Sequence, residues 1–310
     1  MAQPGFVSLT CCFLAGCLVL IILHLSGGLG NQMFQYAFGR SHAKRLGVEL
    51  KLELSDHTLI IHNGFELERL FNINASEATP ADVQSVLGLQ RYGVIRKLIK
   101  AAGLQKLLRS PIVQEPHFHF CPQMSNLNDN TYVNGYWQSE VYFSEIESEI
   151  RADFSFKPPL SKQNAELAEK ISNLNSVSLH VRRNDFAHNS KINATHGLCS
   201  LAYYQAAIRY VAERVKQPYF FIFSDDPAWV TSNLKTDYSC EFVQHNQGKE
   251  SYNDMRLMSL CRHHIIANSS FSWWGAWLNP SETKIVIAPQ QWFANDNNTQ
   301  DLIPQEWVRL

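Results

Sequence analysis

The sequence predicts an α/β protein built on a parallel, doubly wound sheet, and three features of its second half lead to this expectation. Two short apolar segments, Ser176–Val181 and Tyr219–Ser224, are bounded by polar turns, as buried strands are. The segment between them, Ser200–Val215, has the apolar period of a helix, so the three form a βαβ unit. Two further apolar segments, His263–Ala267 and Lys284–Pro289, predict two more strands. In such a sheet the ligand site lies beyond the carboxyl ends of the strands.

The first half of the chain also alternates strand and helix patterns. The apolar segment Leu18–Leu25 runs into a glycine-rich loop, as a buried strand does before a tight turn. The segment Asn31–Gly47 has apolar and aromatic residues at helical spacing and ends on a glycine that caps helices well. Beyond it we expect a strand at Val48–Leu54, helices within Ala78–Gln105 with Pro80 near their start, and a strand, turn and helix start over Tyr132–Phe143.

The segment Phe156–Pro159 is the expected hinge between the two halves. Its two prolines stop regular structure, and the polar stretch that follows marks a change in composition. The predicted organisation is a hydrophobic N-terminal extension, residues 1–17, a first domain, residues 18–157, and a second domain, residues 160–310.

Composition excludes some classes of function. The chain has 27 Lys and Arg against 28 Asp and Glu, and we find no basic run that would follow a phosphate backbone, which argues against a nucleic-acid-binding protein. Its seven cysteines show no metal-ligand spacing, so we expect reduced thiols and a reducing compartment.

The N-terminus allows two interpretations. Phe6–Leu23 carries no charge and approaches the length of a membrane-spanning helix, but no Lys or Arg precedes it. If Leu18–Leu25 is a strand, the remaining Phe6–Cys17 is too short to span a bilayer as a helix, and we favour this interpretation.

Two adjacent arginines, Arg182 and Arg183, directly follow the first strand of the βαβ unit. An arbitrary pair of this kind is more often held at the surface by carboxylates, but this one lies where the sheet is expected to bind its ligand. His180 precedes Arg182 on the same strand face, and Asp185 follows. Guanidinium groups bind phosphate bidentately and stay charged, so the position favours a diphosphate site.

Asp225 and Asp226 follow the second strand of that unit. Asp226 precedes Pro227, which is the usual arrangement of an N-cap residue and a first helical residue. We therefore assign Asp226 to helix capping. Asp225 is then expected to be free to accept hydrogen bonds from the ribose or base of a nucleotide.

The segment "NSSFSWWGAWLN" begins with small polar residues and continues as a Trp-rich helix. Backbone amides at the start of such a helix bind anions, so Ser269 and Ser270 are ligand candidates. Trp273, Trp274 and Trp277 form one broad apolar face and are expected in the core.

The loop "SGGLGNQ" lacks the third glycine of a dinucleotide fingerprint and the lysine of a phosphate-binding loop. Gly30 still permits a close backbone turn, and Asn31 and Gln32 place amide donors beside it. These residues suit a sugar or a diphosphate. In the later segment "GYWQS", which we consider for the acceptor cleft, Tyr136 and Trp137 are expected to be core residues.

Five motifs, "GGLGNQMFQYAFG", "GYWQSEVYF", "HVRRNDF", "FIFSDDPAW" and "NSSFSWWGAWLNP", occur in the order found in glycosyltransferase family 11, the α-1,2-fucosyltransferases. The chain resembles the bacterial members of that family from Leu18 to Leu310. Asn184 and Phe186 stand where the family usually has Gly and Tyr. The resemblance implies an α/β, GT-B-like fold of two Rossmann-type domains with parallel sheets, the first on the acceptor side and the second binding GDP-fucose.

The resemblance also implies inverting transfer of L-fucose from GDP-β-L-fucose to the 2-hydroxyl of a terminal galactoside. The sequence contains no Asp-x-Asp metal motif, so we expect no metal or other cofactor. We expect Arg182 and Arg183, aided by backbone amides at Ser269 and Ser270, to stabilise the negative charge that develops on the departing GDP. By similarity, His180 and Asp225 hold guanosine, and Asn31 holds the diphosphate-fucose. Asp185 and His196 are the candidate bases for the acceptor hydroxyl.

Two alternatives stay open at this point. One is a GDP-fucose-dependent transferase of another linkage, O- or α-1,6-. The other is a glycan-binding module without chemistry. We expect a cytoplasmic protein, associated with a membrane if residues 1–17 act as an anchor, with a type II membrane protein of the Golgi as the alternative.

Overall fold

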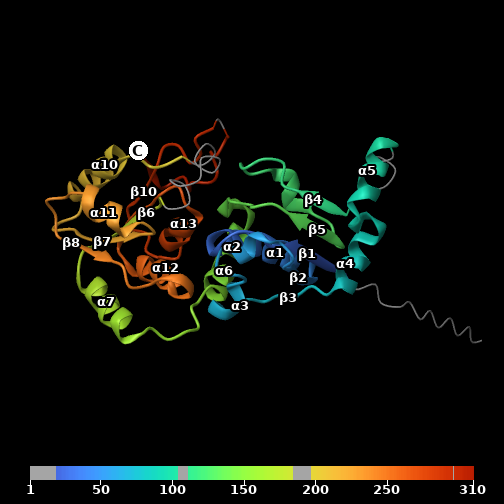
Figure 1. Ribbon diagram of the computed structural model, residues 1–310, viewed down its shortest axis with the longest axis horizontal. Coiled ribbons are helices and arrows are strands. Elements are labelled where there is room, and N and C mark those ends of the chain that lie inside the picture. Colours follow the sequence, from blue (N-terminus) through green and yellow to red (C-terminus); the bar gives the residue numbers. More distant parts are fainter. Residues whose placement is uncertain (1–18, 104–110, 184–196, 296) are drawn as a thin grey trace, which may run out of the picture.

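The computed structural model describes residues 19–103, 111–183, 197–295 and 297–310. They form two sheets in which every paired strand is parallel. Figure 1 shows the sheets in opposite halves of an elongated molecule, with α1, α6 and α13 lying between them. The parallel α/β prediction is therefore confirmed.

The first sheet has the strand order β3-β2-β1-β5-β4. Its strands are β1 (Leu20–His24), β2 (Glu49–Glu53), β3 (Ser76–Glu77), β4 (Ile112–Gln114) and β5 (Thr131–Asn134). The predicted strands at Leu18–Leu25 and Val48–Leu54 correspond to β1 and β2. β3 and β4 were not predicted, because they have only two and three residues and none of these is fully buried.

The helices of the first half are α1 (Leu29–Leu46), α2 (Thr58–Ile61), α3 (Leu67–Leu70), α4 (Pro80–Leu87), α5 (Gly93–Ala101) and α6 (Glu147–Asp153), with short 3-10 turns between some of them. Gly47 ends α1 in the left-handed conformation, with φ of 67°, and its N–H reaches the carbonyls of Ala43 and Lys44. Both the predicted helix and its glycine cap are confirmed.

The second sheet has the order β11-β10-β9-β6-β7-β8. Its strands are β6 (Ser176–Val181), β7 (Tyr219–Ser224), β8 (Cys240–Val243), β9 (His263–Ile265), β10 (Val286–Ala288) and β11 (Val308–Arg309). Around it lie α7 (Lys162–Asn173), α10 (Leu201–Ala212), α11 (Pro227–Asn233), α12 (Tyr252–Leu260) and α13 (Ser270–Trp277). The βαβ unit has the predicted order, whereas the edge strands β8 and β11 were missed.

One continuous apolar core joins the two sheets through α1 and α13. The Phe34 ring lies 4.5 Å from the Trp273 ring and 4.8 Å from the Trp274 ring, measured between centroids. The three tryptophans of α13 are buried, as expected, and so is Trp137. Tyr136 was also expected in the core, but this was wrong: it is 39% exposed because its side chain lines a cavity in the first half.

Two further expectations concern a membrane-spanning segment near the N-terminus and the hinge between the halves. Within the described ranges no helix is long and apolar enough to cross a bilayer, and Leu20–His24 is a strand rather than the end of a spanning helix. The hydrophobic extension, residues 1–17, lies outside the described residues, so whether it anchors the protein stays a prediction. Phe156–Pro159 connects α6 to α7 without regular structure, and the division into domains at this point stays a prediction.

Candidate active site

The predicted cationic site lies where β6 and β7 end side by side. Val181 pairs with Ser224, so the residues that follow the two strands are brought together. The Nε atom of Arg182 lies 3.2 Å from Oδ2 of Asp225, and the backbone N–H of Arg183 donates to Oδ1 of the same carboxylate at 2.8 Å. Asp225 therefore holds both the guanidinium of Arg182 and the turn that carries it.

This geometry corrects one expectation. Asp225 was expected to be free for a nucleotide, but its two oxygens are engaged by Arg182 and by the backbone of Arg183. A carboxylate that neutralises a neighbouring guanidinium positions the cation. A contact from Asp225 to guanosine stays a prediction.

Arg183 is held by different partners. Its Nε atom lies 3.5 Å from Oδ2 of Asp226, and its guanidinium carbon lies 3.8 Å from the centre of the Trp229 ring. Asp226 also accepts a hydrogen bond from the N–H of Trp229 at 3.1 Å, which confirms its predicted role as the N-cap of α11. Arg183 is thus tied to the start of α11, while the side chain of Arg182 keeps 27% of its surface exposed.

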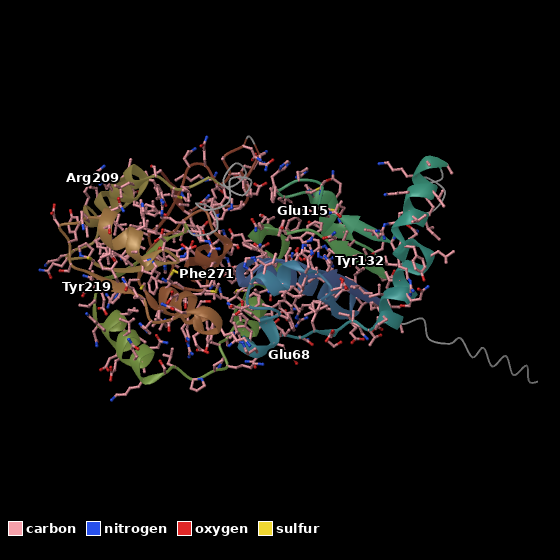
Figure 2. The ribbon with its side chains drawn as sticks, in the orientation of Figure 1. Glu68, Glu115, Tyr132, Arg209, Tyr219 and Phe271 are labelled. Carbon is pink, nitrogen blue, oxygen red and sulfur yellow. The ribbon has the colours of Figure 1, made fainter. Side chains whose placement is uncertain are left out.

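His180 lies beneath this turn and is almost fully buried. Burial, together with the nearby charge of Arg182, lowers the pKa of His180 to about 3, so its ring is neutral at physiological pH. Its Nδ1 atom is buried without a hydrogen-bond partner among the described residues. The ring lies 5.8 Å from that of Phe271, a residue of α13 that Figure 2 labels in the middle of the molecule.

The glycine loop of the first half packs directly on the start of α13. A Cβ atom on Gly30 would lie 2.6 Å from the backbone carbon of Ser270, so only glycine permits this approach. The indole N–H of Trp274 donates to the Gly30 carbonyl at 3.0 Å. Asn31 accepts hydrogen bonds through Oδ1 from the Ser270 hydroxyl at 2.8 Å and from the Gln138 amide at 2.9 Å. The tertiary structure thus joins Gly30, Asn31 and Ser270.

Ser269 and Gln32 have different surroundings. Ser269 is the N-cap of α13, with an extended backbone and no capping bond from its side chain. Its backbone N–H was expected to face the departing charge, but it donates to the carbonyl of Ala267 at 2.8 Å. The Gln32 side chain is fully buried, donates to the carbonyls of Gly27 and Gly64, and accepts from the N–H of Glu66. Gln32 was expected to bind the donor, but its amide holds the loops of the first half together and has no surface for a ligand.

The two candidate bases, Asp185 and His196, lie outside the described residues, and their assignment stays a prediction. In the portion of the chain that the structure describes, no cluster of three or more His, Cys, Asp or Glu side chains has the arrangement of a metal site.

A cavity of about 410 Å³ opens at the carboxyl ends of the first sheet. His24, Asp56, Glu115 and Tyr136 are among the residues that line it. Glu115, which Figure 2 labels, accepts hydrogen bonds from the backbone N–H groups of Tyr136 and Trp137, and these bonds fix the turn after β5. Gln35 connects this wall to the glycine loop, because its amide donates to the carbonyl of Gly135 and to the hydroxyl of Ser26.

Sequence reasoning missed a titratable network at this cavity. His24 lies between two carboxylates, with Nδ1 2.6 Å from Glu53 and Nε2 3.1 Å from Asp56, and Tyr132 donates to Glu53 at 3.0 Å. The hydrogen bond to Glu53 raises the pKa of His24 against the effect of burial. Burial opposes ionisation of Glu53, but the hydrogen bonds it accepts lower its pKa to about 2. The sequence did contain a sign of this network: His24 ends β1 and Asp56 follows β2, and the ends of neighbouring parallel strands lie close together.

A second cavity, of about 500 Å³, lies beyond the ends of β9 and β10. Cys199, Ser200, Asn268 and Gln290 are among its lining residues. It shares the carboxyl edge of the second sheet with Arg182, but neither predicted arginine lines it.

Comparisons with known proteins identify the family of this chain. The model of glycosyl transferase family 11 matches residues 115–310. An α-1,2-colitosyltransferase of Escherichia coli is 35% identical over 295 residues, which cover 94% of this chain and 99% of that protein. The galactoside 2-α-L-fucosyltransferase SEC1 of Bos taurus is 25% identical over 187 residues, which cover 57% of this chain and 51% of that protein.

Among solved structures, the NodZ α-1,6-fucosyltransferase soaked with GDP-fucose superposes with a TM-score of 0.51 at 17% identity, covering 84% of this chain and 93% of that one. This likeness concerns the fold, and it confirms the predicted GT-B-like architecture of two parallel α/β units. The family match over residues 115–310 and the 35% identical relative of nearly equal length show the family that the motifs indicated. The chain belongs to glycosyl transferase family 11 and is a fucosyltransferase-like glycosyltransferase.

Proposed function

We propose that this protein transfers L-fucose from GDP-β-L-fucose to the 2-hydroxyl of a terminal galactoside, with inversion at C1 and without a metal. The observation that carries the proposal is the pair of arginines at the end of β6, each paired with a carboxylate from the end of β7. A fixed guanidinium at the carboxyl edge of a parallel sheet suits a nucleoside diphosphate.

The chemistry requires a cation that is already in place. As the acceptor oxygen bonds to C1 of fucose, the bond from C1 to the β-phosphate oxygen breaks and its electrons pass to GDP. The acceptor hydroxyl gives its proton to a base, for which Asp185 and His196 are the candidates. The ion pair with Asp225 orients Arg182, so little reorganisation is needed when this charge develops. Amides at the start of α13 add further positive potential, and Asn31 and Ser270 fix that start against the glycine loop.

The cavity in the first half is the proposed acceptor site. It combines charged carboxylates, an imidazole and the exposed ring of Tyr136, which are groups that bind sugar hydroxyls and the apolar face of a hexose. Its wall continues through Gln35 into the loop that contacts α13. In this arrangement the acceptor approaches from the first half while the nucleotide is held by the second.

A second candidate is transfer of colitose, which is fucose without its 3-hydroxyl. The 35% identical relative named as an α-1,2-colitosyltransferase favours this donor. A site that hydrogen-bonds a hydroxyl rejects the analogue that lacks it, so the two donors should differ strongly in kcat/KM.

The test is incubation of the purified protein with lactose and either GDP-fucose or GDP-colitose, with and without EDTA, followed by linkage analysis of the product. We expect an α-1,2-linked product whose yield EDTA does not change. An α-1,6 or protein O-linked product would identify a transferase of another linkage. Glycan binding without any product would identify a binding module. Loss of turnover in EDTA that Mn²⁺ restores would overturn the metal-free mechanism.

A further inference from the structure

The helix α5 and the turn before it expose apolar side chains to solvent. None of the nine residues of α5 is buried, and Val94 and Leu98 are 70% and 62% exposed. Leu89, in the preceding 3-10 turn Gly88–Arg91, is 66% exposed. The neighbouring α4 differs, because its Val86 and Leu87 pack with Leu20 and Ile22 of β1. In the described structure α5 therefore has an apolar surface that the sheet does not cover.

The residues of α5 separate into two faces at helical spacing. Val94 and Leu98 are one turn apart, and the half-buried Ile95 and Ile99 lie next to them. Lys97, three residues after Val94, borders the apolar stripe, and Arg96 and Lys100 lie on the remaining side of the helix, so no cation interrupts the stripe.

The charge in this region has one sign. Between Asp82 and Glu115 the sequence contains six Lys and Arg residues and no Asp or Glu, in a chain whose net charge is −1. Two of the six, Lys106 and Arg109, lie outside the described residues, and the other four lie on α5 or in the turn that precedes it. A surface that complements this region must be anionic over its whole extent and must accept apolar side chains.

We infer that α5 docks on the surface of an anionic lipid bilayer, with Val94 and Leu98 at the boundary of the acyl chains and the flanking cations among the headgroups. An amphipathic helix of this composition lies in the plane of the interface, and its Lys and Arg stems extend along apolar surface while their charges reach the headgroups. Figure 1 shows α5 at the end of the molecule opposite α10 and α11, so a flat surface can meet it without meeting the second sheet. This inference does not depend on the proposed reaction.

The experiment is co-sedimentation of the full chain with vesicles of phosphatidylcholine alone and with vesicles of an equal mixture of phosphatidylcholine and phosphatidylglycerol. We expect binding to the anionic vesicles that weakens as salt is raised. Leu98→Glu should weaken it at least about tenfold, because an apolar contact is replaced by a like charge. Lys97→Gln should weaken it about fivefold, the equivalent of about 1 kcal/mol for one cation at such a surface.

Two matched control variants distinguish binding through α5 from a general effect of changing the charge or hydrophobicity of the protein. Lys162→Gln removes one cation from an exposed position of α7, and Leu260→Glu changes an exposed leucine at the end of α12, so both should bind like the parent. Equal binding of the parent to neutral vesicles, no binding to either kind, or unchanged binding of Leu98→Glu would overturn the inference. If the parent pellets without vesicles and Leu98→Glu does not, this face binds a second copy of the chain instead.

Discussion

The guanidinium of Arg182 and the carboxylate of Asp225 lie 3.2 Å apart, across the ends of two neighbouring parallel strands. The two residues are far apart in sequence, and the register of β6 on β7 brings them together. Because Asp225 also accepts the N–H of Arg183, it fixes both the backbone and the charge of the turn. The cation is oriented before any ligand arrives, and this is the property on which the proposed mechanism depends.

Arg182→Ala should lower kcat/KM for GDP-fucose by about 10²- to 10³-fold, because it removes a charge aimed at the departing phosphate. The midpoint of thermal unfolding should change little, since the Arg182 side chain is partly exposed. Arg209→Ala is the matched control, because Arg209 is exposed on α10 at the far end of the second half (Figure 2). Steady-state kinetics measure both variants. A kcat/KM of Arg182→Ala equal to that of the parent would show that Arg182 takes no part in the mechanism.

Asp225→Asn should also lower activity, and its effect should not add to that of Arg182→Ala. If Asp225 acts by orienting Arg182, the double variant is no slower than Arg182→Ala alone, so the double-mutant cycle shows strong coupling. Measurement of kcat/KM for the four proteins decides the point. Additive losses would mean that Asp225 contacts the nucleotide directly, as the sequence led us to expect.

Gly30→Ala should destabilise the protein by about 1–3 kcal/mol, the usual cost of forcing atoms into a packed region. The new methyl group would meet the backbone of Ser270 at 2.6 Å, which a side-chain rotation cannot relieve. Gly93→Ala is the control, because a Cβ there meets only the end of the Arg96 side chain at 3.6 Å. Urea unfolding monitored by tryptophan fluorescence measures both, and equal midpoints would contradict the close approach of the two elements.

The His24–Glu53 pair predicts how stability depends on pH. The pKa of Glu53 is depressed from 4.5 to about 2 in the folded protein, so its contribution is present above pH 4.5 and is lost as the pH falls toward 2. The pKa of His24 is raised, so its contribution is present below about 6.5 and is lost as the pH rises through the higher folded value.

Glu53→Gln should therefore reduce the difference in free energy of unfolding between pH 5 and pH 3 by on the order of 2 kcal/mol. Tyr132→Phe is the milder comparison, because it removes one hydrogen bond to Glu53 and leaves both charges. Denaturant unfolding across this pH range provides the measurement. Parallel pH profiles for the parent and Glu53→Gln would show that the pair contributes nothing to acid stability.

Asp56→Asn should raise KM for the galactoside about tenfold and leave KM for GDP-fucose unchanged, because a charged acceptor of hydrogen bonds is lost from the cavity of the first half. Asp129→Asn, at an exposed position before β5, makes the same chemical change away from that cavity. Initial rates with each substrate varied in turn separate the two constants. A rise in KM for GDP-fucose alone would show that the cavity binds the nucleotide sugar instead of the acceptor.

Local sequence determined the elements that depend on near neighbours. The segments that became β6 and β7 are short runs of mainly apolar and small residues between polar turns. Gly47 ends α1 through its left-handed backbone, and Asp226 with Pro227 begins α11. The motifs also identified the family, because they preserve residue types at short spacing. Each of these features involves residues within one or two turns of each other, so periodicity and capping preferences suffice to find them.

Only the tertiary structure decided which polar groups are free for ligands. Asn31 and Ser270 are 239 residues apart, and His24 and Tyr132 are 108 residues apart, yet each pair is joined by a hydrogen bond. Gln32 is buried and Tyr136 is exposed, contrary to expectation, because loops distant in sequence fill or leave the space around them. The type of a side chain determines which hydrogen bonds it can make. The packing of distant segments determines which of its donors and acceptors remain available to a ligand.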